Sequence, residues 1–324
     1  MEPFELSFSD TQPHELRIEY SHRARLFGAG LTFNWKPPID ALRDEAVAVA
    51  KQADVAVVFV GLSPELEGEE MPIHVEGFDG GDRTTIELPA VQQQMLEAVA
   101  ATGKPVIVVL MNGSALAAKW AKDHAAAVLE AWYPGEEGGT AIANTLAGDN
   151  NPAGRLPVTF YAGTSQLPAF DDYSMANRTY RYFTGEPLWG FGYGLSYSNF
   201  EWSNVRLSKT KLAAGESLTV DADVKNTGEA KGDAVSEIYL KAPASTGAPR
   251  HALVGFVRTP LNGMQQQHIH VVIDPRSLSS VAADGKRSIE PGAYSVFIGG
   301  AQPNGDSGEA AHGFTITGRK ELPR

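Results

Sequence analysis

Glutamates that could carry acid–base chemistry gather in one stretch, residues 53–89, which reads ADVAVVFVGLSPELEGEEMPIHVEGFDGGDRTTIELP. An apolar run at residues 55–60 and a glycine come first, and an acidic loop comes next, with Glu65, Glu67, Glu69 and Glu70. In open α/β sheets, ligands bind beyond the carboxyl ends of the strands, where this loop is expected to lie. A carboxylic acid there could protonate a leaving group, provided that another group supplies the second half of the reaction.

The composition argues against several classes of partner and site. The chain has 324 residues, of which 43% are hydrophobic, a net charge of −12 and no cysteine. A negative charge without any Lys/Arg-rich run argues against a nucleic-acid partner, and without cysteine there is no disulfide and no thiolate metal site. His268 and His270 share one face of an expected strand but have no evident third ligand. GGDR lacks the Lys-Ser/Thr ending of a phosphate loop. We therefore expect no metal and no cofactor.

No segment has the features of a membrane span or a signal peptide. No apolar run approaches the ~18 residues that cross a bilayer. The N-terminus, MEPFELSFSD, lacks a basic segment followed by an apolar one. We expect a soluble protein without a membrane partner, cytoplasmic as it stands, and periplasmic or secreted if it is cut from a longer precursor.

Residues 39–200 alternate between helix and strand, and these elements must position the acidic loop. The apolar runs at residues 55–60 and 106–111 are typical of parallel strands buried on both faces, and residues 126–132 are expected to form a third strand. The intervening segments predict helices at residues 39–53, 89–101, 116–123 and 138–146. This order predicts an α/β sandwich with a doubly wound, mostly parallel sheet.

The two ends of the chain have a different pattern. Helical periodicity disappears after a boundary near residues 197–202, and turn signals separate alternating runs at residues 218–226, 234–242, 268–274 and 293–300. Residues 201–324 are therefore expected to form an all-β sandwich of the fibronectin or immunoglobulin kind. Residues 1–38 are also expected to be β, with strands at 14–22 and 29–35, either as the tail of a larger β domain or as a hairpin packed on the α/β part.

Several long motifs together resemble glycoside hydrolase family 3, which includes β-glucosidases and β-xylosidases. The motifs AWYPGEEGGTAIANTLAGDNNPAGRLPVTF (131–160), DYSMANRTYRYF (172–183) and PLWGFGYGLSYSNF (187–200) resemble its C-terminal α/β sandwich domain. LEGEEM and EGFDGGDRTTIELP resemble the active-site loop of the same family. Residues 201–324 are similar to the fibronectin-III-like domain that ends many members, and residues 1–38 resemble the tail of a PA14-like insert.

The resemblance implies hydrolysis of β-glycosidic bonds by a retaining mechanism, with β-linked oligosaccharides or aryl glycosides as substrates. Family members carry the nucleophile, an Asp followed by a Trp, on an N-terminal barrel, and this sequence has no Asp-Trp pair. We therefore expect the barrel to be absent and a barrel-domain partner or a homo-oligomer to be present. The alternatives are a non-catalytic carbohydrate-binding or interaction remnant, and a self-sufficient hydrolase in which Asp79 or Asp82 replaces the nucleophile.

The resemblance also assigns roles within the acidic loop. In the family, the acid/base glutamate comes from the loop that matches residues 65–70, often in a Gly-Glu pair. Gly68-Glu69 is the best match, so Glu69 is the expected acid/base, and Glu67 and Glu70 are its competitors. For substrate binding the candidates are Asp82 and Arg83, which either contact sugar hydroxyls or hold the loop, and His74, which either contacts sugar or loop or lies on the surface.

Other polar and aromatic groups have two interpretations each. Asn112-Gly113-Ser114 comes after an expected strand and either lines the cleft or forms a turn. The aromatic and basic residues of 178–182, together with the aromatic residues of 189–197, are expected to pack a domain interface, with stacking on sugar rings as the alternative for the first set. Glu136 and Glu137 precede an expected helix, where acids are favoured by the helix dipole, so we interpret them as structural.

Overall fold

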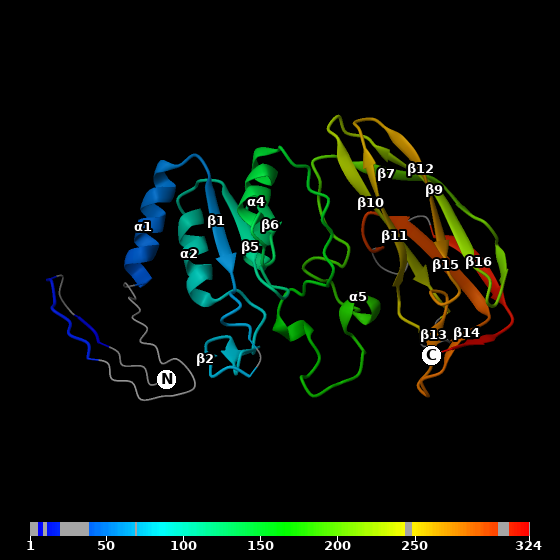
Figure 1. The fold of residues 1–324 in the computed structure, drawn as a ribbon, viewed down its shortest axis with the longest axis horizontal. Helices are drawn as coiled ribbons and strands as arrows, with labels where there is room; N and C mark the ends of the chain where they lie inside the picture. The colour runs from blue at the N-terminus through cyan, green and yellow to red at the C-terminus, as the bar shows by residue number, and fades with distance from the viewer. Residues whose placement is uncertain are drawn as a thin grey trace.

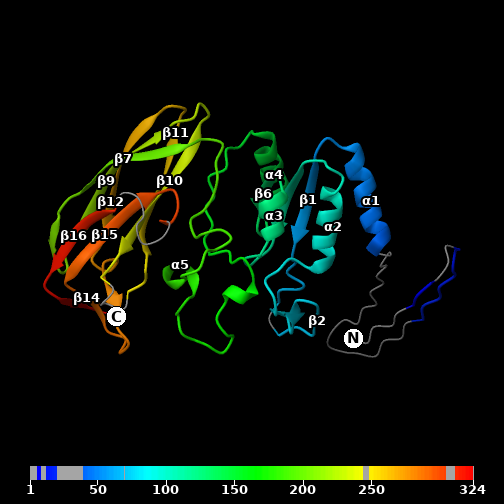
Figure 2. The ribbon, with the colours of Figure 1, turned by 180° about the vertical axis from the view of Figure 1, so that it is seen from behind.

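The structure, a computed structural model, describes residues 6–8, 12–19, 39–68, 70–243, 248–303 and 311–323. An α/β part lies at one end of the molecule and a β sandwich at the other, and residues 148–199 run between them (Figure 1). The view from behind shows the same division (Figure 2). The expected class, an α/β sandwich followed by an all-β sandwich, is confirmed.

Three parallel strands in the order β1-β5-β6 form the sheet of the α/β part. The strands are β1 (Ala56–Gly61), β5 (Val106–Met111) and β6 (Ala127–Glu130). The helices are α1 (Ile39–Gln52), α2 (Ala90–Ala100), α3 (Lys119–His124) and α4 (Gly138–Ala147). The expected alternation of helix and strand is therefore confirmed. Helix α3 begins later than expected because Leu116 is fully buried in the core and Ala117 bridges to Glu87.

Strand β1 is buried on one face only, so the expectation that its apolar run is buried on both faces is wrong. Val58 and Val60 pack in the core with α1 and α2, whereas Val57 and Phe59 are 39% and 52% exposed. The reason is that β1 is the edge strand of the described sheet, and the helices that contact it cover only its Val58 side. An apolar face of β1 therefore remains uncovered by the part of the chain that the structure describes.

A small antiparallel sheet lies beyond the carboxyl end of β1, where Figure 1 labels β2. It consists of β2 (His74–Val75), β3 (Phe78–Asp79) and β4 (Asp82–Arg83). Phe78 is buried and joins this sheet to the main core. Farther along lie the short helices η1 (Thr164–Gln166) and α5 (Thr179–Tyr182).

The β sandwich contains a five-stranded sheet in the order β11-β10-β15-β16-β8 and a three-stranded sheet in the order β12-β9-β7. The strands of the two sheets are β7 (Phe200–Leu207), β8 (Lys211–Ala213), β9 (Leu218–Asn226), β10 (Gly232–Lys241), β11 (Ala252–Leu261), β12 (Gln266–Ile273), β15 (Gly292–Gly299) and β16 (His312–Thr317). A further small sheet joins β13 (Ser280–Val281), β14 (Arg287–Ile289) and β17 (Lys320–Leu322). All four strands predicted in this region are present. Strands β7, β8, β11 and β16 were not predicted. Strand β11 contains Gly255 and Pro260, and the proline is tolerated because β11 is an edge strand.

The N-terminal segment forms no strand in the part that is described. Residues 12–19 have no ladder pairing, and Leu16 and Ile18 are exposed, so the expected strand at 14–22 is wrong over these residues. An alternating pattern becomes a strand only when a neighbouring strand takes up its backbone hydrogen bonds, and no described strand does so here. The strand expected at 29–35 lies outside the described residues, and the three-part domain division stays a prediction.

Candidate functional site

The carboxyl ends of the three parallel strands bring together segments that are far apart in the sequence. The acidic loop comes after β1, Asn112 to Ser114 come after β5, and Trp132 and Tyr133 come after β6. Parallel strands end at the same edge of a sheet, so all three segments meet there. The structure thus gathers carboxylate, amide, hydroxyl and aromatic groups at the edge where the sequence predicted a site.

Glu67 is at the centre of this edge, because both of its oxygens are bound by groups from the other two strands. Gly113 N–H donates to its Oε2 over 3.2 Å, the Tyr133 hydroxyl donates to Oε2 over 2.5 Å, and Ser114 Oγ donates to Oε1. Burial and the bond to Glu67 raise the pKa of the Tyr133 hydroxyl. These donors fix the Glu67 carboxylate, which fastens the acidic loop to the ends of β5 and β6.

Arg83 clamps the same region from the small sheet. Its guanidinium makes four hydrogen bonds, to the carbonyls of Thr85, Ala115 and Glu87 and to Ser114 Oγ, over 3.0 to 3.2 Å. Its charge also interacts with the Glu67 carboxylate. Because most of its donors are already used, this geometry favours the interpretation that Arg83 holds the loop in place.

The glycines of GGDR support the turn that carries the acidic residues. Gly81 has φ +89°, and a Cβ at this position would lie 1.5 Å from the Gly68 carbonyl oxygen. Gly80 accepts a hydrogen bond from Met71 N–H over 2.8 Å and donates one to the Ile73 carbonyl over 2.8 Å. A side chain at position 81 would collide with Gly68, and the two hydrogen bonds of Gly80 tie this turn to Met71 and Ile73.

The structure places the expected site residues in different surroundings. Glu69, the expected acid/base, lies outside the described residues. Glu70 is exposed and has φ 50°, in the left-handed region that non-glycine residues seldom adopt. Asp82 is exposed on β4. His74 Nδ1 lies 2.6 Å from Asp79 Oδ1, with both side chains exposed, which makes it part of a surface pair.

Glu130 is a site residue that sequence reasoning missed. It ends β6, accepts hydrogen bonds from Trp132 N–H over 3.0 Å and from Asn112 Nδ2 over 3.4 Å, and is largely taken out of water. This burial raises its pKa to about 7, because the charged form loses hydration. Asn112 is fully buried beside it. The signal that could have found Glu130 is a carboxylate at the end of an apolar parallel strand.

The aromatic residues between the two parts of the molecule pack an interface, as expected. Tyr180 stacks on Phe191 with ring centroids 4.1 Å apart, and both rings contact Tyr239 of the β sandwich edge to face. The Tyr239 hydroxyl donates to buried Glu237 over 2.5 Å, and burial raises the pKa of that carboxyl. Tyr197 donates to the Thr145 carbonyl over 2.6 Å.

The histidines of β12 lie opposite aspartates of β9. His268 lies 2.9 Å from Asp223 and 3.4 Å from Asp221, and His270 lies 2.8 Å from Asp221. Even so, no group of three or more His, Asp or Glu side chains arranged to hold a metal ion occurs in the part of the chain that the structure describes. Nor does any described helix have the length and apolarity to cross a membrane.

Family models match most of the chain. The glycosyl hydrolase family 3 C-terminal domain matches residues 9–197, and a fibronectin type III-like domain matches residues 234–302. The chain is 38% identical to a xylan 1,4-β-xylosidase of Xylanibacter ruminicola, over 89% of this chain and 33% of that protein. It is also 38% identical to a periplasmic β-glucosidase of Salmonella typhimurium, over 80% of this chain and 34% of that protein.

Solved structures agree with these sequence matches. A β-glucosidase from Erythrobacter marinus has a TM-score of 0.73 and 31% identity, covering 86% of this chain and 36% of that one. A β-glucosidase from Listeria innocua in complex with isofagomine has a TM-score of 0.72 and 28% identity, covering 86% of this chain and 39% of that one. The chain thus spans about a third of the length of these relatives. It belongs to glycosyl hydrolase family 3, of which it contains the C-terminal α/β domain followed by a fibronectin type III-like domain.

Proposed function

We propose that the chain takes part in the hydrolysis of β-glycosidic bonds and supplies the general acid/base from the loop at residues 65–70. Glu69 protonates the leaving oxygen in the first step and activates water in the second, as a retaining mechanism requires. The observation that carries the proposal is the fixed loop beside this position. Glu67 is bound by three donors, and Gly81 lies so close to the Gly68 carbonyl that no side chain fits between them.

The nucleophile comes, in this proposal, from a second carboxylate on a barrel domain that joins this chain at the acidic loop. The names of the relatives suggest the substrates, which are β-xylosides or β-glucosides. A partner is supported by the uncovered face of β1, where Val57 and Phe59 are exposed. Asp79 is a poor substitute for the nucleophile, since it already pairs with His74.

The test compares two leaving groups. The chain is assayed alone and joined to the N-terminal part of the Salmonella relative, with xylobiose and cellobiose (poor leaving groups) and with dinitrophenyl β-xyloside and β-glucoside (good ones). If Glu69 is the general acid, Glu69→Gln loses about 100- to 10,000-fold in kcat on the poor leaving groups and much less on the good ones. Azide, a nucleophile that needs no deprotonation, restores turnover of the dinitrophenyl substrates.

Glu76→Gln, which changes an exposed glutamate of the neighbouring turn, is the matched control and keeps full activity. Equal losses of Glu69→Gln on both leaving groups would contradict the general-acid role. Unchanged activity of Glu69→Gln on both leaving groups would assign the acid/base role to Glu67 or Glu70 instead. Hydrolysis by the chain alone, lost in Glu69→Gln, would refute the need for an added nucleophile.

The second candidate is carbohydrate binding without catalysis, and a cavity of about 560 Å³ between the two parts of the molecule favours it. Tyr180, Phe191 and Tyr193 line this cavity, and aromatic rings pack against the apolar faces of sugars. Thr159 Oγ1 and Gln302 Oε1 are buried in its lining without a hydrogen-bond partner in the described part. Calorimetric titration with glucose and xylose tests this function. The absence of a heat of binding would exclude carbohydrate binding at this cavity.

A further inference from the structure

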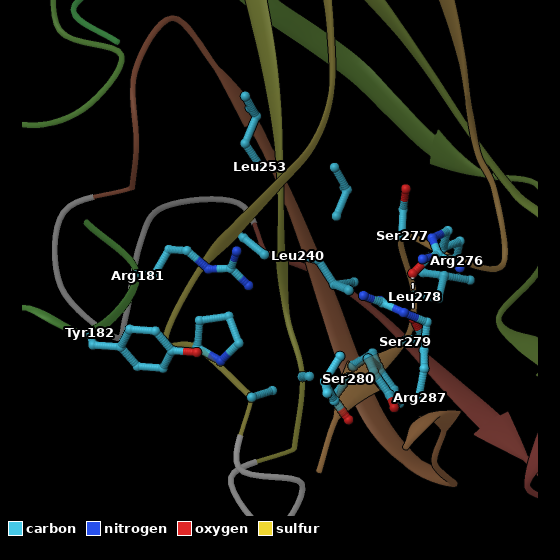
Figure 3. A pocket seen from close by; sticks show the side chains of 17 residues that line it. Arg181, Tyr182, Leu240, Leu253, Arg276, Ser277, Leu278, Ser279, Ser280 and Arg287 are labelled. Carbon is cyan, nitrogen blue, oxygen red and sulfur yellow. Dashed lines mark hydrogen bonds between the residues drawn. The ribbon is translucent and has the colours of Figure 1, made fainter. Parts of the chain in front are cut away.

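A second cavity, of about 360 Å³, lies on the β sandwich and differs from the acidic loop in charge. Figure 3 shows Arg181, from α5, on one side of it and Arg276 and Arg287 on the opposite side. Arg276 comes after β12, and Arg287 begins β14. The fold therefore brings three guanidinium groups from three separate segments to one pocket.

No carboxylate is among the described residues that line this pocket. The chain as a whole carries a net charge of −12, so three cations without an acidic neighbour in the lining are unusual for it. Guanidinium groups are positively charged under ordinary conditions, so three of them around one cavity favour an anion there.

Most of the guanidinium donors here are still available to a ligand. Arg287 donates to Ser279 Oγ over 2.9 Å, and Arg276 donates to the Pro323 carbonyl over 3.0 Å. The Arg181 side chain makes no hydrogen bond to any described residue. Since each guanidinium has five N–H groups, several in this pocket can point at a ligand.

The floor of the pocket strengthens electrostatic binding. Leu240 and Leu278 line it and are buried, as is Tyr294, so part of the wall is apolar and excludes water. Charges interact more strongly beside such a wall than in bulk water. Ser277 and Ser280 also line the pocket, and their hydroxyls add neutral donors.

We propose that this pocket, which we call the arginine pocket, binds a small molecule through an oxyanion group. Planar guanidinium groups match the geometry of carboxylate and phosphate oxygens and bind them through paired N–H donors. The volume suits a single sugar-sized molecule and is too small for a folded partner. Two sources have the required chemistry, a sugar acid and a phosphate, and the experiment separates them.

The test is calorimetric titration of the purified chain at low ionic strength with inorganic phosphate, with glucuronate and with glucose. Binding of glucuronate alone assigns the pocket to a sugar carboxylate, and binding of phosphate alone assigns it to a phosphate group. Either result supports the proposal if Arg181→Gln and Arg287→Gln each weaken that binding by about tenfold or more. Added salt weakens it as well, because it screens exposed charges.

Arg258→Gln is the matched control, since it removes the same charge from β11, where Arg258 pairs with Asp233 over 2.7 Å away from the arginine pocket. It should leave the affinity unchanged. Circular dichroism checks that both pocket variants fold. If Arg287→Gln does not fold, Arg181→Gln alone still tests the proposal. The proposal is overturned if neither anion binds, if Arg181→Gln and Arg287→Gln weaken glucose binding as much as glucuronate binding, or if the pocket variants bind as the parent does.

Discussion

Replacing Glu130 by glutamine should stabilise the protein above about pH 7 and change its stability little near pH 4.5. Burial raises the pKa of Glu130 from 4.5 to about 7. Between these pH values the folded protein holds a proton that the unfolded chain releases, so ionisation lowers the free energy of unfolding as pH rises through this window. At about 1.4 kcal/mol per pH unit, the full cost above pH 7 is about 3 kcal/mol.

Glutamine removes this cost because it carries no charge at any pH, and its carbonyl can still accept the Trp132 N–H bond. The assay is urea unfolding of parent and Glu130→Gln at about pH 5 and about pH 8, followed by tryptophan fluorescence. Glu201→Gln, which changes an exposed glutamate on β7, is the control and should be neutral at both pH values. The reasoning would be refuted if Glu130→Gln raised the free energy of unfolding by the same amount at both pH values, or lowered it at about pH 8.

Three further changes test the loop and the sandwich. Gly81→Ala should lower the free energy of unfolding by about 1–3 kcal/mol, because φ is +89° and the new Cβ would collide with the Gly68 carbonyl; an unchanged thermal midpoint would contradict the described turn. Glu67→Gln should cost about 1–3 kcal/mol in urea unfolding, since its amide would face the donors of Gly113 and Tyr133, and full stability would show that these bonds are not made. His268→Gln should lower the thermal midpoint below pH 6.5 and have no effect well above its raised pKa. The bond to an aspartate favours protonated histidine in the fold, and a pH-independent effect would exclude this pairing.

Local sequence patterns predicted the strands whose apolar or alternating residues form a regular pattern over their whole length. Strand β5 has the bounds that its apolar run predicted, and β9 alternates between buried and partly buried residues along its whole length. Strand β1 has an equally apolar sequence but is exposed on one face, since it lies at the edge of the described sheet. Sequence shows which strand is apolar, and only the strand order shows what covers it.

The acidic loop illustrates the same limit at the site. Its position beyond a parallel strand was evident from sequence, and so was the motif resemblance that assigned the chain to its family. Sequence could not distinguish Glu67 as the carboxylate bound by Gly113, Ser114 and Tyr133, because these donors lie 46 to 66 residues away in the chain.

Composition, periodicity and motifs by themselves determined the α/β and β-sandwich classes, the family and the acidic loop, because these depend on residues that are near one another in sequence. Only the tertiary structure decided that Glu130 is held in a desolvated site and that Arg181 shares a pocket with Arg287. Hydration and charge–charge energies depend on distance in space. Chain folding alone brings these groups from separate segments within that distance.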